Sequence, residues 1–136
     1  MDLSSILKDA GALPRECEPL LLVFHVPRSL PGGSVLLGSD GGTDLVVDST
    51  SGFVISRDPR GEYPTRFMNS SVAQLGRCID AYRVYVMRVK TTPNEDDQIR
   101  LVHELARQIR DIDETSVLSS ENWWSIILEQ AESGLL

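Results

Sequence analysis

Aspartates recur around a glycine-rich stretch in the first half of the chain, where carboxylates could bind a cation. Asp40, Asp44 and Asp48 flank Gly41-Gly42, and calcium takes several carboxylate oxygens at once. A strand rises about 3.3 Å per residue, which would hold Asp44 and Asp48 roughly 13 Å apart. The spacing also lacks the alternating ligands and distal Glu of an EF-hand loop. We therefore predict a tight hairpin turn here and no metal site.

Catalysis needs side chains that converge, and the candidates in this sequence are scattered. His25 falls on an expected strand and His103 on an expected helix, with no motif that pairs them with an acid or a nucleophile. Cys17 and Cys78 form no C-x-x-C pair, so we predict free buried thiols rather than zinc ligands or a redox pair. The glycine-rich stretches lack G-x-G-x-x-G and a P-loop lysine. The sequence predicts no catalytic residue, no cofactor and no enzymatic activity.

The side chains best suited to binding another protein are acidic residues on the expected sheet and its turns, together with a tryptophan. Adjacent helical residues diverge by about 100°, so burying one ring of Trp123-Trp124 is expected to leave the other near the surface. That ring is either a rim residue or a partner hot spot, and a solvated face is the alternative for the carboxylates. The candidate protein-binding residues are Asp40, Asp44, Asp48, Asp58, Glu62 and Trp123.

Strands that would carry these residues fill the first half of the chain. The first is expected to be central and to stop at Pro27, which cannot donate to a ladder. In the third, alternation places Leu45 and Val47 on a buried face and Val46 on a wet one. The turn 58–61 has Pro and Gly at type I positions. The expected strands are 20–26, 35–39, 44–48, 53–56 and about 63–68.

Helices fill the second half. Ser71 and Gln74 form a capping box, and a second box starts at Thr92. Apolar residues then follow at spacings of three and four. Further helices are expected over roughly 3–10 and from Glu121 to about Glu132. This order predicts an α+β fold in one domain, 1–136: a twisted antiparallel sheet of four to five strands (residues about 20–69), packed by an N-terminal helix and three C-terminal helices.

Composition narrows the class of partner. The chain has 136 residues, 41% of them hydrophobic, a net charge of −7 and a pI near 4.7. A folded acidic protein is unsuited to binding nucleic acid directly or an anionic membrane, because both require clustered Lys and Arg. A basic protein partner fits better. With no basic leader or long apolar stretch near the start, the expected location is the cytoplasm.

The order of several short motifs resembles the SUKH superfamily of bacterial immunity proteins, in particular its fourth family. The segments that carry the resemblance are 38–48 followed by Gly52-Phe53-Val54, then 67–72 opening a helix, Ile112-Asp113, Trp123-Trp124 and the ending 134–136. The resemblance spans residues from about 13 to 136. It implies an α+β domain without catalytic residues.

This resemblance further implies an antidote that binds and neutralises a cognate polymorphic toxin. Toxins of this family are often nucleases or nucleic-acid deaminases. An adaptor or regulatory protein-binding module is the alternative, because some relatives of the fold act in that way. A small enzyme or ligand-binding domain is a third hypothesis, and it would require a deep polar pocket with a perturbed titrating group.

Overall fold

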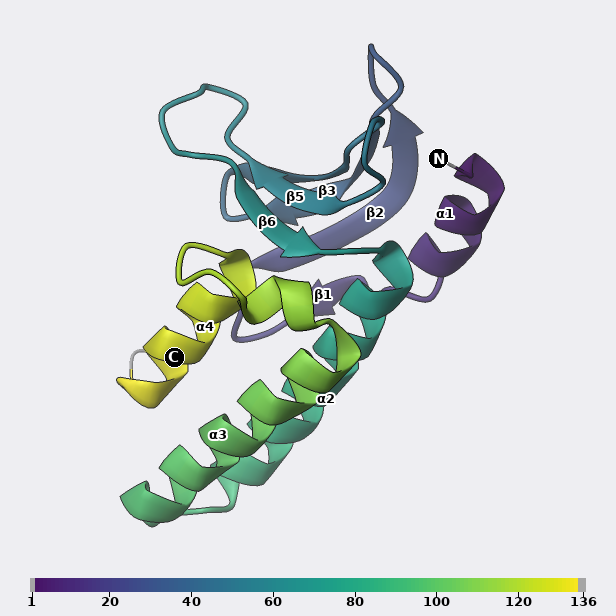
Figure 1. Ribbon diagram of the computed structural model, residues 1–136. Helices are drawn as coiled ribbons and strands as arrows, with labels where there is room; N and C mark the ends of the chain where they lie inside the picture. Colours follow the sequence, from purple (N-terminus) through teal and green to yellow (C-terminus); the bar gives the residue numbers. More distant parts are fainter. Residues whose placement is uncertain (1, 135–136) are drawn as a thin grey trace.

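The computed structural model describes residues 2–134 as a curved antiparallel sheet with helices packed against it (Figure 1). The six strands follow one another in the order β1-β2-β3-β4-β5-β6, so the α+β prediction is confirmed with one strand more than expected. The elements are α1 (Leu3–Ala10), β1 (Glu16–Cys17), β2 (Leu22–Ser29), β3 (Val35–Asp40), β4 (Thr43–Val47), β5 (Val54–Arg57), β6 (Arg66–Asn69), α2 (Val72–Lys90), α3 (Glu95–Ile112), the 3₁₀ helix η1 (Glu114–Val117) and α4 (Trp123–Glu132).

Strand β2 differs from the prediction in its end and in its place. It continues through Pro27 to Ser29, because the pairing with β3 is irregular between Phe24 and Arg28 and Pro27 owes no ladder hydrogen bond there. The two-residue strand β1, which the sequence did not reveal, pairs only with Leu22 and Val23. The rest of β2 is therefore an edge rather than a central strand.

The expectation of one buried and one wet face on β4 is wrong. Val46 is fully buried, like its neighbours Leu45 and Val47. On the face that Val46 occupies, register pairing forms a second apolar row. The row consists of Leu36, Val46, Ile55 and Phe67.

The helix starts follow the capping chemistry in part. Ser71 caps α2 as predicted, since its hydroxyl accepts from the Gln74 N–H at 3.2 Å. The reciprocal half of the predicted capping box is wrong, because the Gln74 side chain instead accepts from the Ser71 hydroxyl and donates to the Ile112 carbonyl. Helix α3 starts later than predicted: Asn94, rather than Thr92, is the N-cap and accepts from the Asp97 N–H. Helix α4 begins two residues after the predicted Glu121. The unpredicted η1 fills the space between α3 and α4.

The main core lies between the sheet and helices α2, α3 and α4. Its largest fully buried side chains include Trp124 and Tyr82. Cys17 and Cys78 are both buried and free, as predicted. Helices α2 and α3 form an antiparallel pair that projects away from the sheet and beyond α4 (Figure 1). None of the helices within residues 2–134 combines the length and apolar composition that crossing a bilayer requires.

Candidate functional site

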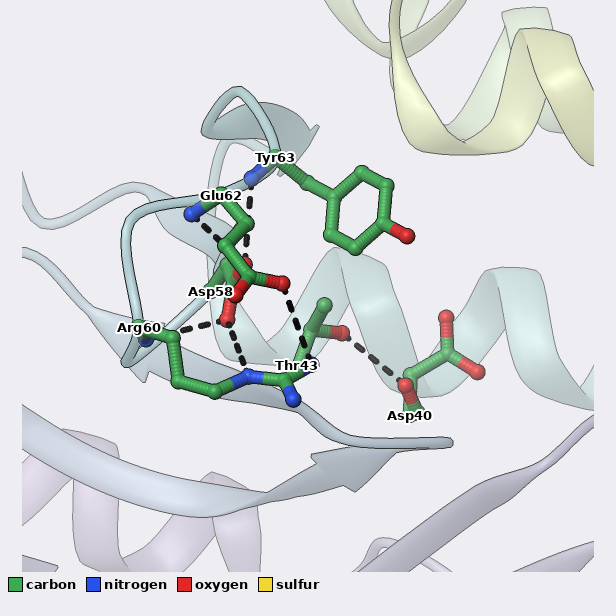
Figure 2. Close-up of polar contacts among 6 residues, drawn as sticks. All are labelled: Asp40, Thr43, Asp58, Arg60, Glu62 and Tyr63. Carbon is green, nitrogen blue, oxygen red and sulfur yellow. Dashed lines mark hydrogen bonds and ion pairs between the residues drawn. The ribbon is translucent and has the colours of Figure 1, made fainter.

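Asp58 turns inward and holds the β5–β6 turn together (Figure 2). Its side chain is only 1% exposed, and its carboxylate accepts from the backbone N–H groups of Arg60, Glu62 and Tyr63 at 2.9–3.0 Å. The hydrogen bond from Arg60 is the main cause that lowers the pKa of Asp58. The type I turn is as predicted, with the Gly61 N–H donating to the Asp58 carbonyl. The expected surface position of Asp58 is wrong, because the turn uses the carboxylate.

Two other predicted aspartates also serve the fold. The Asp40 carboxylate accepts from the Trp123 indole N–H at 2.7 Å. The Asp48 carboxylate accepts from the backbone N–H and hydroxyl of Ser51, and the backbone bond is the main cause that lowers the Asp48 pKa. Both side chains are half-buried, and they lie at opposite ends of the β3–β4 hairpin.

Asp44 and Glu62 remain the most available of the predicted carboxylates. Asp44 is half-buried and lies opposite Arg57 on the neighbouring strand. Glu62 is exposed and forms a 3.8 Å ion pair with Arg60. Such an exposed pair is worth little and leaves the carboxylate free to meet a partner. Asp40, Asp58 and Glu62 lie around Thr43 and Arg60 (Figure 2), but Asp58 is buried in its turn and Asp48 lies at the far end of the hairpin, so the predicted residues form no single exposed acidic patch.

Trp123 is 5% exposed, so the expectation that one tryptophan would lie at the surface is wrong. The two rings do diverge, in a T-shaped pair with centroids 4.8 Å apart. Both rings are nevertheless buried, because α4 begins between β3, which carries Asp40, and β6, which carries Asn69. Trp123 reaches Asp40 on β3, whereas Trp124 donates to Asn69 on β6 at 2.9 Å.

A largely buried polar network, which we define as Asn69, Ser70, Asp113 and Trp124, lies where β6 ends, α2 begins, α3 ends and α4 begins. The Asp113 carboxylate accepts from the Asn69 amide at 3.1 Å and from both the N–H and hydroxyl of Ser70 at 2.7 Å. The Asn69 oxygen accepts from Trp124. The family resemblance rests partly on these same residues, and their hydrogen bonds show that they stabilise the fold.

Sequence reasoning missed a wide groove on the helical side of the molecule. It lies between the α2–α3 pair and the end of α4, with the β1–β2 connection at its base, and has a volume of about 970 Å³. Tyr85, Val86, Val89 and Ile99 contribute apolar surface. The signal was present: the apolar stripe of α2 continues through Val86 and Val89 after Tyr82, the last buried residue of the helix. We call this hollow the helical groove.

Across residues 2–134, no group of three or more His, Cys, Asp or Glu side chains could hold a metal ion. His25 is exposed and its ring contacts the neighbouring Val26 carbonyl. His103 lies 3.2 Å from the Glu132 carboxylate on an exposed surface. The large hollow is lined mainly by apolar groups, which bind by burying surface.

Comparison with known proteins identifies the family. The model of the SUKH-4 immunity protein family matches residues 16–130, which covers every strand and almost all of α4. Comparisons with curated proteins and with solved structures found no match. The family match covers most of the chain and agrees with the motifs of the hairpin, the α2 cap and Asp113. This chain belongs to the SUKH-4 immunity protein family.

Proposed function

We propose that this protein neutralises a cognate polymorphic toxin by binding it in the cytoplasm, and that it performs no reaction of its own. The observation that supports this function is the family match over residues 16–130. We propose further that the toxin is a basic nuclease or nucleic-acid deaminase. Such enzymes hold phosphates with Lys and Arg, so an antidote with a net charge of −7 is attracted to that surface and can cover it.

The direct test is co-expression of this protein with the C-terminal domain of the large toxin encoded beside its gene. We expect growth to be rescued and the two proteins to elute together on gel filtration. Persistent toxicity without a complex would contradict the proposal. Capture of regulatory proteins instead, in a strain without an adjacent toxin gene, would favour the adaptor function.

Charge on the sheet side is proposed to speed the encounter with the toxin. Asp44 and Glu62 are the predicted carboxylates best placed for this role, because Asp58 and Trp123 are buried and can affect a partner only through the shape that they hold. The double variant Asp44→Lys with Glu62→Lys should slow association about tenfold and flatten its salt dependence. Asp48 is left intact because it holds Ser51 in the turn. Unchanged association kinetics would show that the carboxylates on the sheet side do not speed the encounter with the toxin.

A further inference from the structure

We propose that the helical groove is the close-contact site for the toxin and that its occupant is a basic amphipathic helix of that toxin. This inference rests on the proposed function and adds the surface and the chemistry of the segment bound there. It places the tight contact in the groove between α2, α3 and the end of α4, which none of the predicted binding residues lines.

The floor of the groove exposes apolar surface that nothing in residues 2–134 covers. Tyr85, Val86 and Val89 are half-buried, and Ile99 is 38% exposed although it continues the stripe of Val102 and Leu105. Contiguous apolar side chains that stay partly exposed are typical of a protein-interaction surface.

The charged residues around the groove floor indicate the charge of the partner. The charged residues that line the groove are Glu16, Glu18, Lys90, Glu95 and Glu132. Four carboxylates against one ammonium favour an occupant that carries Lys or Arg beside its apolar face. A second copy of this acidic chain would bring like charges together, which disfavours self-association here.

The geometry favours a helix as the occupant. Val86 and Val89 lie three residues apart on α2, and the exposed Ile99 of α3 lines the same groove. Such ridges accept the i, i+3 and i+4 side chains of another helix. A partner helix would pack beside α2 and α3 where α4 ends, since Ala131 to Gly134 form the end wall of the groove.

The first experiment compares two double charge reversals against the toxin domain. Glu16 and Glu18 are exposed and make no ion pair within the described chain, so Glu16→Lys with Glu18→Lys should leave folding intact. We expect Kd to rise about 100-fold, mainly through faster dissociation. The matched control is Asp44→Lys with Glu62→Lys, which changes the net charge equally on the sheet side and should alter association alone. Equal effects of the two variants on the dissociation rate would contradict the proposal that the helical groove is the close-contact site.

The second experiment tests the groove without the toxin. A synthetic helical peptide with Leu on one face and Lys on the other is titrated into the ¹⁵N-labelled protein. We expect amide shifts centred on Val86, Val89 and Ile99 that disappear in the Glu16→Lys, Glu18→Lys variant and persist in the control. Shifts spread over the sheet side, or equal in both variants, would overturn the inference. So would a dimer of the free protein that the groove variant dissociates, because a second copy would then be the occupant.

These outcomes separate the two proposals. If the wild-type protein fails to bind the toxin domain while the peptide maps to the groove, the proposed function fails and the groove stands as a site for basic helices. If the toxin binds and neither the groove variant nor the peptide shows an effect at the groove, the antidote function stands and the groove inference fails.

Discussion

The two ends of helix α2 differ in how completely the side chains around them are packed and hydrogen-bonded. At its start, the polar network joins β6, α3 and α4, and the carboxylate of Asp113 is fully occupied by donors from Asn69 and Ser70. Toward its C-terminal end, the half-buried apolar side chains of Tyr85, Val86 and Val89 line an open groove. Residues that complete their own contacts maintain the fold, whereas residues left incomplete are available to a partner. The difference predicts which substitutions change stability and which change binding.

The largest stability effect is expected at the polar network. Replacing Asp113 by Ala leaves the buried Asn69 amide and the half-buried Ser70 donors without this acceptor, which should lower the free energy of unfolding by about 3 kcal/mol. Urea denaturation followed by circular dichroism measures this loss of unfolding free energy. Asp111→Ala is the control, because Asp111 is exposed near the end of α3, two residues before Asp113, and should change stability by less than about 0.5 kcal/mol. If the two variants were equally stable, the contrast between the ends of α2 would lose its basis.

The same pair of variants separates folding from binding. Measured below the unfolding transition, Asp113→Ala should bind the toxin domain with an unchanged Kd, because the network does not line the helical groove. A large loss of affinity in the folded variant would instead assign the network to the interface.

Local chemistry made much of the fold predictable from the sequence. The α2 cap at Ser71 depends on atoms three residues away, and the turn at Asp58 on atoms within five residues. The positions of the tryptophans depend on distant partners: 83 residues separate Asp40 from Trp123. Spacing along one helix carries no information on such contacts. The burial of Trp123 was therefore beyond local reasoning.

The candidate site was less predictable than the fold for a related reason. An apolar stripe has the same pattern whether a core or a partner covers it, so Val86 and Val89 resembled core residues. Likewise, a carboxylate such as Asp58 has the same charge in the sequence whether it faces solvent or backbone N–H groups. Only the three-dimensional arrangement distinguishes these cases, because it shows which groups are already paired.

The two cysteines allow the polar network and the groove to be compared through the reactivity of their thiols. Cys78 contacts Asn69 of the polar network, and burial raises its pKa from 9.0 to about 12, whereas Cys17 lies in the two-residue strand β1 at the base of the groove. Opening of β1 should expose Cys17 without global unfolding. We expect iodoacetamide to label Cys17 at least about tenfold faster than Cys78, as measured by mass spectrometry. Equal rates would mean that both thiols react only through global unfolding.

The raised pKa of Cys78 also fixes the sign of a pH effect. A thiol that stays protonated in the folded state contributes stability below its unfolded pKa of 9.0, and this contribution is lost as pH rises toward about 12. The urea midpoint should therefore fall across this range, and the fall should be smaller in Cys78→Ala. A slope that is unchanged in the variant would assign the alkaline effect to other groups, such as Tyr82, whose pKa burial also raises.

A smaller effect of opposite sign is expected beside the groove. Tyr82→Phe removes a buried hydroxyl that has no hydrogen-bond partner among residues 2–134, so the variant should gain about 0.5–1 kcal/mol in unfolding free energy. Tyr85→Phe is the matched control on the next turn, where the ring is half-buried, and it should change stability by less than about 0.5 kcal/mol. A loss of stability in Tyr82→Phe would show that its hydroxyl is paired in solution.

Two substitutions on α3 separate the groove floor from the core along one helix. Ile99 and Val102 share the apolar stripe of α3, but Ile99 is 38% exposed and Val102 is 3% exposed. Val102→Ala should cost about 2 kcal/mol, whereas Ile99→Ala should cost about 0.5 kcal/mol because much of its surface already meets water. In binding to the toxin domain the order should reverse, with Ile99→Ala raising Kd about tenfold and Val102→Ala changing it little. Since the two positions lie one turn apart, a reversal of this kind would locate the boundary between core and interface to a single helical turn.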